Sequence, residues 1–71
     1  MKELNSTYSD AINLLAKTFN LPKTITDSNW QKFRNAINSI SETNTKVSDL
    51  MALHLSMINS FFDIYENDTV N

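Results

Sequence analysis

The chain has 71 residues, with no glycine, no cysteine, one proline and a formal net charge of −2. This length corresponds to one small domain, and the lack of glycine excludes phosphate-binding loops and dinucleotide fingerprints, whose turns need its backbone freedom. The lack of cysteine excludes a disulfide framework, a thiolate nucleophile and a cysteine zinc site. A hydrophobic content of 41% is sufficient for a packed core.

The first predicted helix covers residues 4–20. Its apolar residues recur at helical spacing and define one face: Leu4, Tyr8, Ala11, Ile12, Leu15, Ala16 and Phe19. Pro22 disfavours the helical conformation for Leu21, because its ring collides with the preceding residue. We therefore expect this helix to end near Asn20.

The second predicted helix covers residues 27–42. Thr26 is placed to cap its N-terminus, and Asp27 suits the positive charge of the first turn. Ile25 can pack on Trp30 as a hydrophobic staple. A narrow core-facing stripe then follows with 3-4-3 spacing: Trp30, Phe33, Ile37 and Ile40.

The segment Ser41–Thr45 is rich in residues that favour helix caps over helix interiors. We place a turn there, with Asn44 or Thr45 capping a third helix over residues 45–66 and a frayed tail over 67–71. The helical spacing also continues through this segment, which contains no glycine or proline. One continuous helix over residues 27–65 therefore stays an alternative.

The third predicted helix has a wide apolar arc of about 200° at 100° per residue, roughly twice the usual stripe. Its members are Val47, Leu50, Met51, Leu53, Leu55, Met57, Ile58, Phe61, Phe62, Ile64 and Tyr65. Two modest helices cannot easily cover so wide a surface. Either this helix is central in the bundle, or part of it packs on another molecule. We predict an all-α, three-helix domain, a helical hairpin plus an N-terminal helix, that forms a dimeric bundle.

The aromatic and methionine content of this helix is typical of protein interfaces. We predict an interface that includes Leu50, Met51, His54, Met57, Ile58, Phe61, Phe62 and Tyr65. An intramolecular core is the alternative for the same residues.

His54 lies near the centre of the apolar arc, with Met51 and Met57 one turn away on either side. The three side chains could form a soft-metal site, or His54 could make an interface sensitive to pH. A histidine packed in a core or dimer seam is the simpler interpretation, because no thiolate or nearby carboxylate completes a ligand set. We expect no metal and no cofactor.

Acid–base catalysis needs a positioned pair of groups, whereas the acidic residues fall on predicted polar faces or caps. Six of the eight acidic residues are placed in this way: Asp10, Asp27, Glu42, Asp49, Asp63 and Glu66. A serine nucleophile lacks the glycine-containing elbow that would present it. We therefore expect no enzymatic activity and no small-molecule substrate.

All six Lys and Arg residues lie within 1–46, and residues 47–71 hold four acidic residues and no basic one. The weak basic patch that could form consists of Lys17, Lys23, Lys32, Arg34 and Lys46. With one arginine and a pI near 5.0, we expect neither a nucleic-acid partner nor binding to an anionic membrane. The first residues lack the apolar segment of a signal peptide, and Leu50–Leu55 is far shorter than a membrane span, so we expect a cytoplasmic protein.

Three features together resemble the YmgB/AriR family of small enterobacterial regulators, over roughly residues 8–68. The first helix ends shortly before an isoleucine-containing cap, the second closes on two isoleucines and an acid, and the apolar last helix leads into an acidic tail. The residues concerned are Ile25, Thr26, Asp27, Ser28 and Asn29, then Ile37, Ile40 and Glu42, then Glu66 and Asp68. Pro22 departs from the pattern, which has a more flexible, glycine-type ending there.

This resemblance implies an all-helical homodimer that acts as a connector in two-component signalling, with links to biofilm and acid-stress control and no catalytic residues. Two other functions stay open. The chain is also similar to type III secretion needle subunits, although it continues beyond the apolar helix into a polar tail. A phage-type or antitoxin-like inhibitor that masks a target protein would show the same apolar helix. The sequence thus predicts a non-enzymatic regulatory or adaptor protein that binds itself, another protein, or both.

Overall fold

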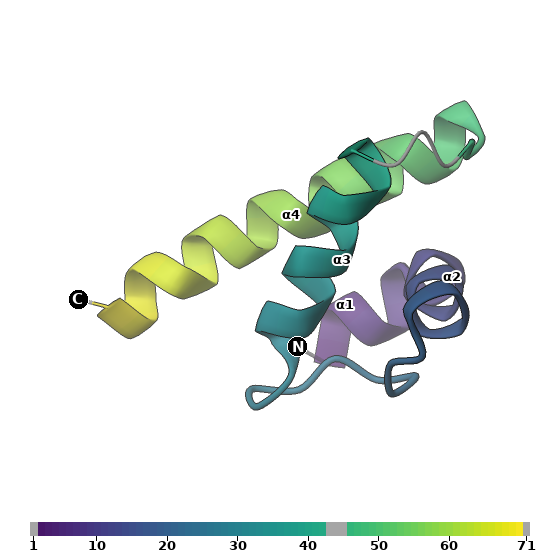
Figure 1. Ribbon diagram of the computed structural model, residues 1–71. Coiled ribbons are helices and arrows are strands. Elements are labelled where there is room, and N and C mark those ends of the chain that lie inside the picture. The colour runs from purple at the N-terminus through teal and green to yellow at the C-terminus, as the bar shows by residue number, and fades with distance from the viewer. Residues whose placement is uncertain (1, 43–45, 71) are drawn as a thin grey trace.

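The computed structural model describes residues 2–42 and 46–70 (Figure 1). Within this part of the chain there are four helices and no strand: α1 (Lys2–Thr7), α2 (Ser9–Phe19), α3 (Trp30–Glu42) and α4 (Asp49–Val70). The predicted all-α class is therefore confirmed. The first helix differs from the prediction, because the chain over residues 4–20 forms two helices instead of one.

Helix α4 runs the length of the molecule, α3 crosses it, and the α1–α2 pair lies to one side (Figure 1). The 22 residues of α4 correspond to about 33 Å of helix, which is close to the longest dimension of the molecule, 35 Å. Helix α3 packs against both α2 and α4, and α2 also packs against α4. Helix α4 therefore packs against α2 and α3, while α1 packs against α2.

The division of the first helix lies at Tyr8, whose backbone (φ −115°, ψ 34°) departs from helical geometry. The helical hydrogen bonds continue on both sides, from Tyr8 N to Leu4 O (2.9 Å) and from Ile12 N to Tyr8 O (3.0 Å). The chain is thus bent at this point and not interrupted. The ring of Tyr8 lies against His54 and Phe61 of α4, and such a tertiary contact cannot be read from helical spacing.

Helix α2 ends where Pro22 predicts. Asn20 adopts the left-handed conformation (φ 55°, ψ 50°), and the Leu21 amide donates to the Ala16 carbonyl at 2.9 Å. Glycine is the usual residue at this position because it has no Cβ, and asparagine is the next best. In a chain without glycine, Asn20 provides this helix end.

The loop before α3 is fixed at both ends. The Asn5 side chain accepts a hydrogen bond from the Ile25 amide (2.8 Å) and donates one to the Ile25 carbonyl (3.0 Å). The Thr26 amide donates to the Asn29 side chain at 2.7 Å. Residues 27–29 form a turn, so α3 begins at Trp30 and not at 27 as predicted.

Helices α3 and α4 are separate, because Lys46, Val47 and Ser48 are not helical. The predicted caps Asn44 and Thr45 lie outside the described residues. The hydroxyl of Ser48 accepts a hydrogen bond from the Met51 amide (3.1 Å), so Ser48 caps a helix that starts at Asp49 instead of residue 45. The tail predicted as frayed from residue 67 is helical through Val70, since nothing in it stops a helix.

The core is formed by apolar side chains from all four helices and the loop residue Ile25. Its buried members are Leu4, Ala11, Ile12, Leu15, Ile25, Trp30, Phe33, Ala36, Ile37, Ile40, Leu55, Ile58 and Phe62. The Trp30 ring packs on Phe62 and Tyr65 of α4, with centroid distances of 5.7 and 5.4 Å. The predicted stripes of the first two helical segments are thus the faces that the fold buries.

Candidate interaction surface on helix α4

A row of large apolar side chains is exposed along α4. They are Leu50 (63% exposed), Leu53 (57%), Met57 (43%), Phe61 (44%) and Ile64 (61%). At 100° per residue they fall within about 80° of the helix circumference, and at 1.5 Å per residue they extend over about 21 Å. We call these five residues the outer stripe.

The opposite part of the apolar arc is buried. Leu55, Ile58 and Phe62 are at most 5% exposed and belong to the core. The arc predicted from the sequence is therefore divided lengthwise, with one half packed inside the domain and the other half facing outward. Single exposed apolar residues are ordinary on a protein surface, whereas a row of five along one side of a helix makes that side a candidate interaction surface.

The structure separates the eight predicted interface residues into three groups. Leu50, Met57 and Phe61 lie on the outer stripe. Met51, His54 and Tyr65 are partly buried. Ile58 and Phe62 are fully buried, so their prediction as interface residues is corrected, because packing against α2 and α3 occupies their side of α4.

Leu53 and Ile64 were absent from the predicted interface, although both lie within the predicted arc. The missing information was which edge of the arc faces the rest of the chain. Leu53 and Ile64 are the members that lie farthest around the helix from Leu55 and Phe62. Their position at the extreme edge was the available signal.

His54 lies at the border between the two halves of the arc. Its ring meets that of Tyr8 edge-on, at a centroid distance of 5.4 Å. Met51 packs against the core, whereas Met57 is exposed on the outer stripe. Among the described residues, no group of three or more His, Cys, Asp or Glu side chains is arranged to hold a metal ion.

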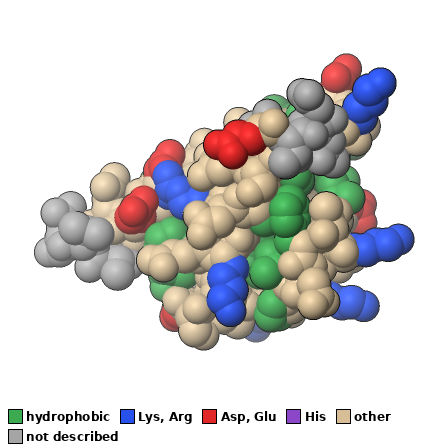
Figure 2. Space-filling view, in the orientation of Figure 1, with side chains coloured by type: hydrophobic (Ala, Val, Ile, Leu, Met, Phe, Trp, Pro, Cys, Tyr) green, Lys and Arg blue, Asp and Glu red, His purple; other side chains and the backbone are tan. Residues whose placement is uncertain are grey.

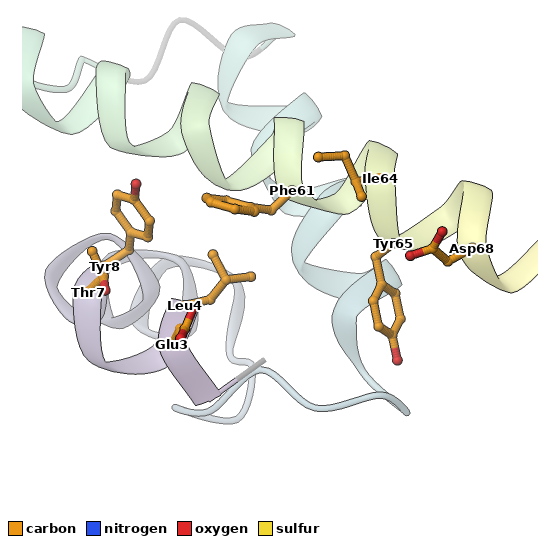
Figure 3. Close-up of a pocket in the computed structure, with 8 residues that line it drawn as sticks. All are labelled: Glu3, Leu4, Thr7, Tyr8, Phe61, Ile64, Tyr65 and Asp68. Atoms are coloured by element: carbon orange, nitrogen blue, oxygen red, sulfur yellow. The ribbon is translucent and has the colours of Figure 1, made fainter.

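A pocket of about 280 Å³ lies beside the C-terminal end of the outer stripe, between α1 and α4 (Figure 3). Leu4 and Tyr8 extend from the N-terminal part of the chain toward Phe61, and Asp68 lies beyond Tyr65 along α4. The lining consists of Glu3, Leu4, Thr7, Tyr8, Phe61, Ile64, Tyr65 and Asp68. Phe61 and Ile64 belong both to this pocket and to the outer stripe, so the two features form one continuous surface.

The lining combines aromatic rings with negative charge. Tyr8, Phe61 and Tyr65 supply the rings, Glu3 and Asp68 supply carboxylates, and no basic residue is among the lining residues. Aromatic faces and carboxylates both attract cations. The volume lies just below the range of about 300–1,000 Å³ that is usual for small-molecule sites. The lining is therefore compatible with a cationic group that carries an apolar stem.

One wall of the pocket is held by a hydrogen bond from the Tyr65 hydroxyl to the Asp27 carboxylate. This bond, assisted by partial desolvation and by the negative charge of Asp27, raises the pKa of the Tyr65 hydroxyl above its ordinary value of 10.0. The neutral phenol is therefore the form that the fold favours, and in that form Tyr65 connects α4 to the turn before α3.

Arg34 fixes the position of α4 from α3. Its guanidinium forms an ion pair with Asp63, and a second with Glu66 at 3.1 Å. Arg34 is thereby engaged inside the domain instead of contributing to the weak basic patch expected from the sequence. On the face shown in Figure 2 the Lys and Arg side chains stand at several separate places.

Comparison of the chain with models of protein families, with curated proteins and with solved structures finds no match. In the part of the chain that the structure describes, no helix has the length and apolar character needed to cross a membrane.

Proposed function

We propose that this chain is a non-enzymatic regulatory or adaptor protein that acts by binding proteins, and that it forms a homodimer through the outer stripe. The observation that carries the proposal is the exposure of five large apolar side chains in line on α4. When a partner covers the exposed half of one of these side chains, the burial contributes about 1 kcal/mol to the free energy of association. A helix face of this kind is a common docking surface for another helix.

The cellular role that we propose for the homodimer is based on the resemblance to the YmgB/AriR family. This resemblance supports a connector in two-component signalling, or a regulator of biofilm formation or stress responses, that acts in the cytoplasm. The proposal rests on the surface that the outer stripe presents to a partner.

Sedimentation equilibrium at micromolar concentration tests the proposal with two variants of α4. We expect the wild type to have twice the chain mass of 8.1 kDa. Leu53→Asp introduces a charge into the outer stripe and should give a monomer. Ala52→Asp introduces the same charge at an exposed position about 140° from the centre of the outer stripe, and should sediment as the wild type does.

Circular dichroism of each variant distinguishes lost association from lost folding. A wild type that stays at 8.1 kDa over the whole concentration range contradicts self-association. In that case the outer stripe would serve a different partner, as in an inhibitor that masks its target. Open-ended polymers would instead favour the subunit of a helical assembly, because polymers need two different complementary surfaces on each subunit.

A further inference from the structure

We infer that the second copy lies antiparallel on the outer stripe and inserts its Lys46 into the pocket lined by Glu3, Phe61 and Asp68. This inference rests on the proposed self-association and specifies its geometry. It assigns the pocket a ligand, which is a lysine side chain supplied by another molecule of the same protein.

The spacing of the outer stripe is symmetric about its centre. From Leu50 to Ile64 the intervals are 3, 4, 4 and 3 residues, so the row reads the same in both directions from Met57. A twofold interface requires a surface that is complementary to itself. In an antiparallel pair, Met57 meets Met57 of the second copy, and Leu53 meets Phe61 of the second copy.

The symmetry extends to the charges at the two ends. Lys46 precedes Leu50 by four residues, and Asp68 follows Ile64 by four residues. Lys46 lies three residues before the start of α4, so antiparallel pairing directs it toward the end of the second copy's α4 that carries Asp68, and does so twice in each dimer. Parallel pairing would place Lys46 beside Lys46 and Asp68 beside Asp68, which like charges disfavour.

The pocket lies at the end of the outer stripe toward which Lys46 of the second copy is directed. Phe61 and Ile64 form the C-terminal end of the outer stripe and also line the pocket, together with Glu3 and Asp68 (Figure 3). A lysine side chain has an apolar stem and a charged tip. The stem can pack along the rings while the ammonium group meets the Asp68 carboxylate at one end of the pocket, and the rings add a cation–π attraction.

Within one chain the same contact cannot form. Asp49 and Asp68 are the first and a near-terminal residue of α4, and their separation along the helix is about 28 Å. Lys46 precedes Asp49 by three residues, so it lies at the far end of the molecule from its own pocket. Any coupling between Lys46 and Asp68 therefore reports a contact between two chains.

One contact beside the outer stripe is between two negative charges and disfavours antiparallel pairing, but an ion pair within each chain reduces this repulsion. Antiparallel packing brings Asp49 of the second copy toward Asp63. Asp63 forms an ion pair with Arg34 of its own chain, which reduces the repulsion that Asp49 meets. The charges at the ends of the outer stripe are thus the ones that select the orientation.

Exchange of the two charges tests the inference. Lys46→Glu alone and Asp68→Lys alone each place like charges at both contacts, and each should raise the dimer dissociation constant about tenfold at low ionic strength. In a mixture of the two variants, every contact of the heterodimer pairs opposite charges. We expect the mixture to associate about as tightly as the wild type, whereas Lys23→Glu, an exposed charge change elsewhere, should have little effect.

The outcomes separate this inference from the proposed function. If both single variants and their mixture dimerise as the wild type does, while Leu53→Asp is monomeric, the outer stripe is the interface but the antiparallel lysine contact is wrong. If the wild type itself is monomeric, self-association fails and this contact fails with it. Recovery of dimerisation only on mixing supports both.

Discussion

The hydroxyl of Tyr65 donates a hydrogen bond to the carboxylate of Asp27, and so joins the C-terminal half of α4 to the turn before α3. The two residues are 38 positions apart in the sequence. The Tyr65 ring also packs edge-on against Trp30 at 5.4 Å and lines the pocket. One side chain therefore connects the domain's core packing to its candidate binding surface.

Tyr65→Phe should lower the free energy of unfolding while leaving the fold unchanged. The substitution keeps the ring and removes the hydroxyl that Asp27 accepts from. Urea denaturation followed by circular dichroism should show a lower midpoint with an unchanged slope. Tyr8→Phe is the matched control, because the described contacts of Tyr8 are made by its ring, and its midpoint should move less. Equal midpoints for wild type and Tyr65→Phe would contradict the structural role of the bond.

The raised pKa of Tyr65 predicts a specific dependence of stability on pH. Because the folded state favours the neutral phenol, this contribution to stability is fully present below pH 10.0, the ordinary pKa. It is lost as the pH rises through the raised pKa of the folded state. Absorbance at alkaline pH, measured in the Tyr8→Phe variant so that Tyr65 is the one tyrosine left, should give a pKa above 10.0. Asp27→Asn should lower that value.

Phe33 and Phe61 provide a test of the division between core and outer stripe. Phe33 is fully buried and Phe61 is 44% exposed. Phe33→Ala should cost about 3–5 kcal/mol, a large part of the roughly 4–10 kcal/mol expected for a chain of this length. Phe61→Ala should cost about 1 kcal/mol or less when measured on the dilute monomer. Comparable losses for the two variants would place Phe61 in the core.

Asn20 tests how the chain ends a helix without glycine. Asn20→Ala should cost about 1 kcal/mol, because a residue with a plain Cβ is strained at a φ of 55°. Asn20→Gly should leave stability equal or higher, since glycine adopts this conformation freely. Thermal unfolding of the two variants gives the comparison. A stability of Asn20→Ala equal to that of Asn20→Gly would show that the left-handed conformation is not required.

The sequence was sufficient to predict the helical class and most of the buried residues. The spacing of Trp30, Phe33, Ile37 and Ile40 identifies a face that the structure buries, and Pro22 correctly locates the end of α2. The bend at Tyr8 was not predicted, because it accompanies contacts with α4 that are distant in sequence. The start of α4 was placed too early because Asn44, Thr45 and Ser48 all have side chains that can cap a helix.

The candidate site was predicted in part. The width of the apolar arc indicated that α4 has more apolar surface than two helices can cover, and the exposure of Leu50 and Leu53 agrees. Periodicity gives the arc but not the side from which α2 and α3 approach, so the predicted interface included Ile58 and Phe62, which the structure buries in the core. The pocket could not be predicted, because its lining combines residues of α1 with residues of α4 that are distant in the sequence.

The most direct test of the central claim is oxidative crosslinking of single-cysteine variants, which is clean because the chain has no cysteine of its own. Met57→Cys places a thiol at the centre of the outer stripe, where the two copies meet around the twofold axis. We expect it to form a disulfide-linked dimer rapidly, while Leu50→Cys, whose counterpart is about 21 Å away in an antiparallel pair, and the off-stripe control Ala52→Cys do not. Crosslinking at Ala52→Cys as fast as at Met57→Cys, or none at Met57→Cys, would contradict pairing of two copies through the outer stripe.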